Sequence, residues 1–266
     1  MGTYRLAIHP LHNPQKLFES YQPLVDYINK KIPEIYIELE ASRDYPTFER
    51  KLHAREPDLL LPNPWQTLQA MESGYRVIAM AGDAKDFKGI FIVRKDNNIK
   101  KPIELKGRSV SYPASTALAA AIMPQYFLYS KGLDINKDIE NIYVGSQESS
   151  IMNVYLGKVA VGATWPPPWR LFQRDNPEKA KQLKVIWQTP PLINNSVMVR
   201  DDFPVAISKK IQNLLVTLGE SAEGKAIISG METSLFTMAK DADYDVVRKY
   251  IKHFEANVRL VETSHD

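Results

Sequence analysis

Residues 3–40 read TYRLAIHPLHNPQKLFESYQPLVDYINKKIPEIYIELE, and this stretch indicates the fold class. It begins with a short strand and continues over Pro14–Lys31 with apolar residues every three or four positions, as in an amphipathic helix. It ends over Glu34–Glu40 in an alternating, β-branched strand. Strands and helices go on alternating through the first two-thirds of the chain. This alternation predicts an α/β protein with mostly parallel sheets flanked by helices.

Length and composition place the chain among large soluble globular proteins. Its 266 residues suffice for about two ordinary domains, so two sheets, one in each half, fit better than one large sheet. Apolar residues make up 44% and charged residues 24%. The 34 basic and 31 acidic residues leave a net charge of +3 without a basic cluster, which argues against nucleic acid as a partner. No apolar stretch reaches the ~18–20 residues that cross a bilayer.

Several kinds of catalytic and cofactor site are missing from the sequence. The chain has no cysteine, which excludes disulfides, thiolate metal sites and thiol nucleophiles. No Gly-x-Gly-x-x-Gly, Gly-rich Lys-Ser/Thr loop or Gly-x-Ser-x-Gly elbow occurs. The five histidines are His9, His12, His53, His253 and His265. His9 follows the first strand and is interpreted as a polar surface residue, with a ligand hydrogen bond as the alternative. We expect no cofactor, no metal and no enzymatic activity.

A small polar segment is the best candidate for binding chemistry. Pro113-Ala114-Ser115-Thr116-Ala117 follows a predicted strand over Ser109–Tyr112 and is predicted to open a helix towards Gly132, interrupted at Pro124. A helix N-terminus carries unpaired amides and partial positive charge, and hydroxyls there complete an anion site. The alternative is that Ser115 is only the N-cap of the helix.

Two aromatic segments follow the ends of predicted strands, where open α/β sheets bind ligands. Thr164–Trp169 comes after one strand, and Trp165 there either stacks on a ligand or packs against its own domain. For Trp169 we expect packing. Pro62–Trp65 has the matching place in the first half, where Asn63 could bond a ligand and Trp65 is expected in the core.

Several segments, taken in order, resemble one protein family. They are Pro14–Tyr27, Ala41–Tyr45, Pro113–Thr116, Pro177–Trp187 and Tyr244–Arg248. The chain resembles, over nearly its whole length, the phosphate/phosphonate-binding family of ABC-transporter solute-binding proteins, of the phosphonate-binding type. The resemblance implies a two-lobed periplasmic-binding-protein-like fold (type 2) with a ligand cleft between the lobes. We expect lobe one over residues 1–91 and 196–266, lobe two over 92–195, and a hinge near 90–94 and 195–200.

The resemblance also implies a partial pocket. Tyr45 matches a family tyrosine that contacts the ligand, and Ser115 and Thr116 match two of three hydroxyl residues that hold the phosphonate. The third hydroxyl position is Ala117. The family histidine falls at Gln147, which is followed by Glu148 and can still donate a hydrogen bond.

Other positions depart from the family pattern. A second family tyrosine falls at Phe87. The two carboxylates that hold the amino end of an aminoalkylphosphonate fall at Pro167 and Asn195, so an aminoethylphosphonate-like ligand is in doubt. Glu148 is either a cleft residue or a helix-start carboxylate. The expected ligand site is Tyr45, Asn63, Ser115, Thr116, Ala117, Gln147, Glu148, Trp165 and Asn195.

The expected function is capture of a small ligand, a phosphonate- or phosphate-like oxyanion, by closure of two lobes for an ABC transporter. The expected partners are that ligand and a permease, and the protein is expected to be a monomeric periplasmic or extracytoplasmic one whose targeting segment was removed. One alternative is the ligand-binding sensor domain of a membrane histidine kinase or similar receptor. An enzyme on the same fold ranks below both, since fold does not fix function.

Overall fold

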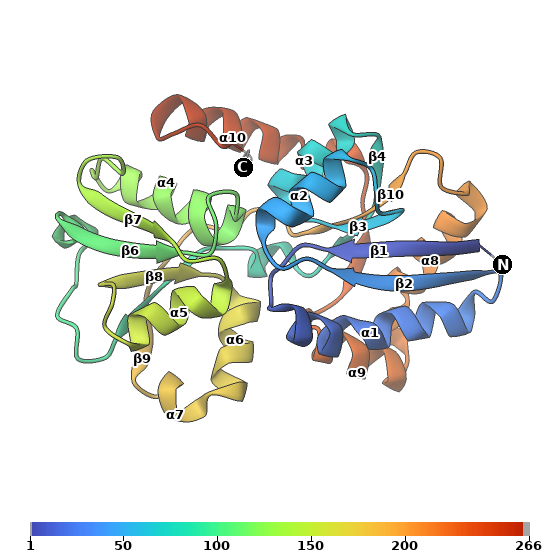
Figure 1. Cartoon of the computed structure of the whole chain (residues 1–266), viewed down its shortest axis with the longest axis horizontal. Helices are drawn as coiled ribbons and strands as arrows, with labels where there is room; N and C mark the ends of the chain where they lie inside the picture. Colours follow the sequence, from blue (N-terminus) through green and yellow to red (C-terminus); the bar gives the residue numbers. More distant parts are fainter. Residues whose placement is uncertain (1, 263–266) are drawn as a thin grey trace. The chain divides into compact units, whose positions relative to one another are not determined.

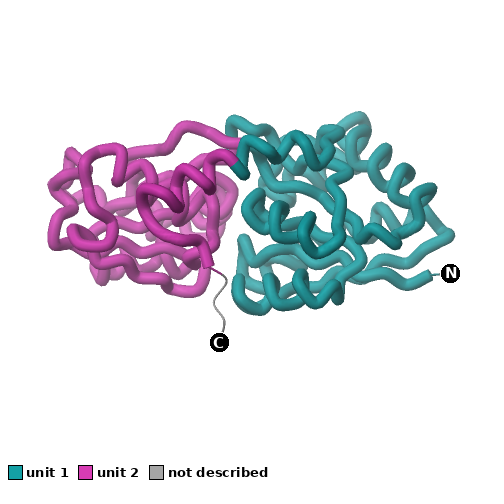
Figure 2. The backbone as a smooth tube through the Cα atoms, turned by 90° about the horizontal axis from the view of Figure 1, so that it is seen from above, with its two compact units in different colours: residues 1–86, 193–248, 265–266 teal, residues 87–192, 249–264 magenta. Residues whose placement is uncertain are grey.

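A computed structural model of the chain describes residues 2–262. Contacts divide this part of the chain into two compact units, coloured separately in Figure 2. The first unit comprises residues 2–86 and 193–248, and the second comprises residues 87–192 and 249–262. The chain therefore passes between the units three times, and each unit is built from discontinuous segments.

Within residues 2–262, the first unit holds a six-stranded sheet in the order β11-β4-β10-β3-β1-β2. Its strands are β1 (Gly2–Ile8), β2 (Ile35–Ala41), β3 (Leu59–Leu61), β4 (Tyr75–Ala81), β10 (Ser196–Arg200) and β11 (Phe236–Met238). Strands β1, β2, β3 and β4 run in one direction, whereas β10 and β11 run against them. The sheet is thus mostly parallel, as the alternation of strands and helices predicts.

Helices cover both faces of this first sheet. They are α1 (Pro14–Lys31), α2 (Tyr45–His53), α3 (Pro64–Glu72), α8 (Val205–Val216) and α9 (Ala222–Gly230). Figure 1 shows α1 and α9 on one face of β1 and β2, and α2 and α3 on the other. This arrangement follows from right-handed crossovers, because the chain moves one way from β1 to β2 and back the other way to β3. Asp44 caps α2 through its side chain, which accepts a hydrogen bond from the Thr47 amide at 2.9 Å.

The described part of the second unit holds a five-stranded sheet in the order β7-β6-β8-β5-β9. Its strands are β5 (Ile90–Arg94), β6 (Arg108–Tyr112), β7 (Ile139–Tyr143), β8 (Val161–Thr164) and β9 (Leu183–Gln188). The helices are α4 (Met123–Ser130), α5 (Gln147–Tyr155), α6 (Pro166–Asp175), α7 (Pro177–Ala180) and the second half of α10 (Asp245–Asn257). Only β5 runs against the other four strands.

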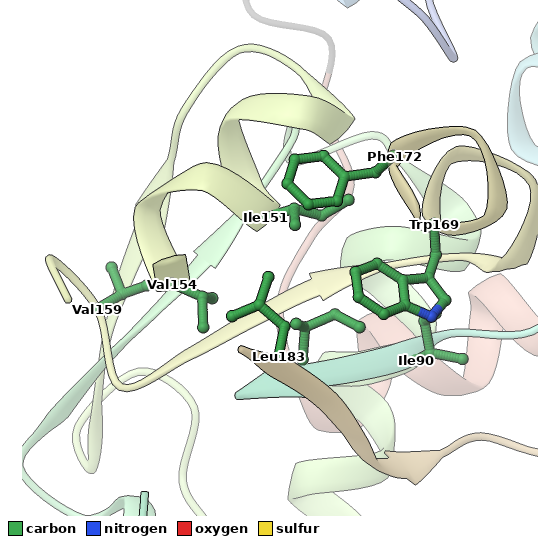
Figure 3. Packing of buried hydrophobic residues seen from close by; sticks show 8 residues of the cluster. Ile90, Ile151, Val154, Val159, Trp169, Phe172 and Leu183 are labelled. Atoms are coloured by element: carbon green, nitrogen blue, oxygen red, sulfur yellow. The ribbon is translucent and has the colours of Figure 1, made fainter. Parts of the chain in front are cut away.

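The core on one face of the second sheet joins α5 and α6 to β5 and β9 (Figure 3). Trp169 and Phe172 of α6 stack with their ring centroids 6.0 Å apart, over Ile151 and Val154 of α5. The expectation that Trp169 packs in the core is confirmed. In the first unit Trp65 is 3% exposed, so it is a core residue as expected.

The two units differ from the expected lobes in three places, one of which is that residues 193–195 belong to the first unit instead of lobe two. Residues 87–91 belong to the second unit, because β5 pairs along its whole length with β9 and over three residues with β8. Residues 249–262 also belong to the second unit, because Tyr250 and His253 of α10 pack against Tyr126 of α4, with ring centroids 5.5 Å apart in each pair. These findings correct the expected boundaries at 91 and 196–266. Residue 1 and residues 263–266, which include His265, lie outside the described residues.

Gly162 of β8 supports the second sheet by its lack of a side chain. A Cβ there would lie 2.7 Å from the Ser150 carbonyl oxygen and 2.6 Å from Val154 Cγ2. We expect Gly162→Ala to lower the free energy of unfolding by about 1–3 kcal/mol, because overpacking forces backbone shifts. Urea unfolding measures this loss. Gly230→Ala is the control, since nothing lies within 4 Å of a Cβ there. Equal midpoints for both variants would contradict the prediction.

Candidate functional site

The predicted site residues of the second unit follow strands that end at one edge of its sheet. Strands β6, β7 and β8 are parallel, so their carboxyl ends meet at the same edge. Residues 113–117 follow β6, Gln147 lies beyond β7, and Trp165 comes directly after β8. The topology therefore gathers the polar loop, the amide and the indole at the carboxyl edge of the second sheet.

The loop over residues 113–117 forms a turn rather than the first turn of a helix. The Ala117 amide donates to the Ala114 carbonyl at 3.2 Å, and the helix starts at Leu118 as a π-helical segment, Leu118–Ile122. Ala117 is the cap residue, so the interpretation of Ser115 as an N-cap is wrong. Ser115 is half-buried, and Thr116 is 3% exposed. Two hydroxyl residues thus stand just before a helix N-terminus, at the predicted location but two residues further from the helix.

The predicted interruption at Pro124 is confirmed. The π-helical segment gives way to α4 at Met123, and Pro124 occupies its first turn. A π-bulge of this kind is rare and is frequent at functional sites. Here the π-helical segment directly follows the loop over residues 113–117.

Gln147 is the first residue of α5 and is 2% exposed. Thr164 Oγ1 donates a hydrogen bond of 2.8 Å to Gln147 Oε1. The amide is therefore oriented by the last residue of β8, with its Nε2 donor on the side away from Thr164. Glu148 is exposed in the first turn of α5, where a carboxylate interacts favourably with the helix dipole.

Trp165 packs inside its own unit. Its ring centroid lies 5.4 Å from that of Phe87, and the residue is 4% exposed as the cap position of α6. Phe87 stands where the family resemblance places a tyrosine. The two rings therefore form an aromatic wall at the carboxyl edge of β8, without a phenolic hydroxyl.

The predicted site residues of the first unit also share one sheet edge. The carboxyl ends of β1, β2, β3 and β4 meet there, and the antiparallel β10 begins there. This edge therefore carries His9 after β1, Tyr45 beyond β2, Asn63 after β3 and Asn195 before β10. Helices α1, α2 and α3 all begin near it, which gives the edge a positive electrostatic potential.

Asn63 has a structural role at this edge. Its Oδ1 accepts from the Gln66 amide at 2.9 Å, and Gln66 Oε1 accepts from the Asn63 amide at 3.0 Å, which is a capping box at the start of α3. Gln66 Nε2 in turn donates to the buried Glu49 at 3.0 Å. The amide oxygen of Asn63 is thereby committed to the start of α3.

Asn195 differs from Asn63 in its side-chain contacts. It is 3% exposed, and its Oδ1 is buried with no hydrogen-bond partner within the described part of the chain. Its backbone is held on both sides, because its amide donates to Asn194 Oδ1 and its carbonyl accepts from Ala81. Since a buried polar group without a partner is costly, this amide is suited to a polar ligand group.

His9 is the residue at this edge whose burial the sequence did not predict. It is 2% exposed, so its interpretation as a surface residue is wrong. Nδ1 lies 3.0 Å from the Leu61 carbonyl oxygen, and the ring centroid lies 6.2 Å from that of Tyr45, which is itself 2% exposed. Burial lowers the pKa of His9 from 6.5 to about 4, so the imidazole is neutral and Nδ1–H donates to Leu61.

Neither a metal-binding cluster nor a membrane-spanning helix is found among residues 2–262. No group of three or more His, Cys, Asp or Glu side chains between residues 2 and 262 is placed to hold a metal ion. Over the same range, no helix combines the length and apolar character that crossing a bilayer requires. Each sheet edge, taken by itself, carries polar side chains and helix N-termini that are suited to hydrogen bonds with a polar ligand group.

Each of the two units is an α/β domain with a mostly parallel sheet flanked by helices, which is the architecture expected of a two-lobed solute-binding protein. The family described as "ABC transporter, phosphonate, periplasmic substrate-binding protein" matches residues 6–244. The chain belongs to this family, whose members are substrate-binding components of transporters and not enzymes.

Individual relatives are distant in sequence and near in fold. A Prochlorococcus marinus (strain MIT 9301) protein named "Probable ABC transporter phosphite binding protein PhnD1" is 25% identical over 181 residues, or 63% of this chain and 61% of that protein. The match therefore spans less than two-thirds of that relative's length.

Two solved structures show the likeness in fold. The structure of PhnD1 from Prochlorococcus marinus (MIT 9301) in complex with methylphosphonate has a TM-score of 0.85 at 19% identity, covering 95% of this chain and 98% of that one. A binding-protein component of an ABC phosphonate transporter from Pseudomonas aeruginosa has a TM-score of 0.88 at 17% identity, covering 96% and 87%. These structures support the two-lobed α/β fold.

Proposed function

We propose that this protein captures a small phosphorus oxyanion and delivers it to the permease of an ABC transporter in the periplasm. The observation that carries the proposal is the pair of hydroxyl residues, Ser115 and Thr116, in a turn just before a helix N-terminus at the carboxyl edge of β6. Hydroxyl and amide donors around a helix N-terminus hold an anion without a direct countercharge. Membership of the phosphonate family supports phosphorus as the central atom.

The ligand class we propose is an oxyanion without a cationic tail, such as phosphite or methylphosphonate. The family positions for carboxylates that bind an amino group hold Pro167 and Asn195 in this chain. Pro167 is buried in the first turn of α6, and Asn195 offers a neutral amide. An ammonium group at either position would therefore be desolvated without a compensating charge. The aromatic wall of Phe87 and Trp165 is suited to an oxyanion whose phosphorus carries a small apolar group, as in methylphosphonate, or no carbon group, as in phosphite.

In this proposal the ligand contacts both units. Ser115, Thr116 and Gln147 contribute from the second, while Tyr45 and Asn195 contribute from the first. Binding then favours a closed arrangement, because only such an arrangement satisfies both sets of contacts. A monomer is proposed as the working form, and size-exclusion chromatography with light scattering tests that point.

A thermal-shift panel on refolded, ligand-stripped protein tests the proposed ligand class. We expect phosphite or methylphosphonate to raise the melting temperature, because a ligand at 100 times its Kd stabilises a protein by about 2.7 kcal/mol. Aminoethylphosphonate should give a smaller shift, and sulfate is the control for a nonspecific anion effect. If no phosphorus oxyanion shifts the protein while a neutral or aromatic compound does, the proposal is wrong.

A further inference from the structure

Arg259, in the C-terminal segment, donates a hydrogen bond to the backbone of the hydroxyl loop, residues 113–117. Its Nη2 donates to the Ser115 carbonyl oxygen at 2.7 Å, and its Nε donates to Gln125 Oε1 at 2.8 Å. The guanidinium carbon also lies 5.3 Å from the ring centroid of Phe254 and 6.0 Å from that of Tyr143. All these residues belong to the second unit. A third hydrogen bond runs from Nη1 to the Leu260 carbonyl oxygen at 3.0 Å, so three hydrogen bonds and two aromatic contacts fix the position of the side chain.

The charge of Arg259 has no carboxylate paired with it. None of the ion pairs within residues 2–262 includes Arg259, and the one nearby acid, Glu255, accepts a hydrogen bond from the Val261 amide. Burial lowers the pKa of the Arg259 guanidinium, yet an arginine stays protonated at neutral pH. A partly buried positive charge that forms no ion pair within residues 2–262 thus lies against a loop that has hydroxyls but no cation of its own.

The contact with Ser115 also acts through the peptide bond. The Ser115 carbonyl and the Thr116 amide belong to one peptide group. A charged donor on the carbonyl oxygen polarises that group and makes the Thr116 N–H a stronger hydrogen-bond donor. The same contact fixes the turn in which both hydroxyls stand.

We propose that Arg259 is a positioning residue of the anion site, which holds the 113–117 loop in its binding conformation and supplies the positive charge that the loop lacks. The inference rests on the proposed function for its ligand. It also gives the returning C-terminal segment, residues 249–262, a part in binding that neither the family motifs nor the sequence pattern assigns to it.

Three variants separate the positioning role from the charge. Arg259→Gln removes the charge and most of the bonds, so we expect Kd for methylphosphonate and phosphite, measured by titration calorimetry, to rise about tenfold or more. Gln125→Glu keeps an acceptor for Arg259 and neutralises it, so affinity should fall while the loop stays ordered. Arg259→Lys keeps the charge and loses the fork geometry, so its affinity should lie between those of the wild type and Arg259→Gln.

Hydrogen exchange of the unliganded protein tests the positioning role without any ligand. Amides of residues 114–122 should exchange faster in Arg259→Gln than in the wild type, whereas those of residues 147–156 should not change. Lys252→Gln, on the exposed face of α10, removes the same charge without touching the loop and is the matched control.

The outcomes are distinct. Wild-type affinity and exchange in Arg259→Gln would overturn the inference, as would an equal loss of affinity in Lys252→Gln. If the wild type binds neither oxyanion, the proposed function and the charge role fail together. Faster exchange of the amides of residues 114–122 then still supports the positioning of the loop, and unchanged exchange overturns that as well. Urea midpoints establish that each variant is folded.

Discussion

Replacing Ser115 and Thr116 together with alanine is expected to reduce affinity for the phosphorus oxyanion at least about a hundredfold, because a hydrogen bond to a charged group is worth about 1.5–3 kcal/mol and two are removed. Each single variant should lose part of this affinity. The two side chains stand in one turn before the helix at Leu118, so their losses are expected to be non-additive. Titration calorimetry with methylphosphonate and phosphite measures the effect.

Ser130→Ala is the matched control for the double variant. Ser130 ends α4 in the same unit, is exposed, and donates only to the Phe127 carbonyl oxygen. We expect its affinity to equal that of the wild type. An unchanged Kd in the Ser115→Ala, Thr116→Ala double variant would remove the loop from the binding site, and with it the main support for the proposed function.

Acid should weaken the protein through His9. The pKa of His9 is about 4 in the folded protein and about 6.5 when unfolded, because burial disfavours the imidazolium. Between these values the unfolded chain binds the extra proton, so stability falls as pH drops from about 6.5 to about 4. We expect the free energy of unfolding to fall on the order of 2 kcal/mol between pH 7 and pH 5 from this residue alone.

His9→Asn should remove most of that pH dependence. An asparagine amide can donate to the Leu61 carbonyl oxygen in place of Nδ1–H, and it does not titrate. His253→Asn on α10 is the control, because His253 is exposed. Urea unfolding at pH 7 and pH 5 supplies the comparison. Parallel slopes for the wild type and His9→Asn would contradict the assignment of acid sensitivity to His9.

Local signals predicted several features because each depends on neighbouring residues. The helix after the loop over residues 113–117 is interrupted at Pro124, as expected from proline sterics. The Asp44 cap of α2 likewise depends only on residues next to it in the chain. The part of the first unit after Val205 is not a simple run of helices, because a short strand, β11, adds to the edge of the first sheet at Phe236. A three-residue edge strand leaves little trace in the pattern of apolar residues.

The site was predictable only in part. The positions of residues 113–117, Gln147 and Trp165 after strand ends follow from the order of the elements, and the topology brings them to one edge. Their individual contacts could not be read from the sequence. Ser115 lies two residues outside the cap position, and Trp165 packs on a residue 78 positions earlier in the chain.

The sequence by itself determined the alternation of strands and helices, and therefore two mostly parallel sheets, because hydrophobic periodicity is a local property of the chain. Only the tertiary structure decided that His9 is buried and neutral, that residues 249–262 return to the second unit, and that Arg259 contacts the loop 144 positions before it. Burial, pKa and long-range contacts depend on which distant segments pack together, and that packing has no local signature.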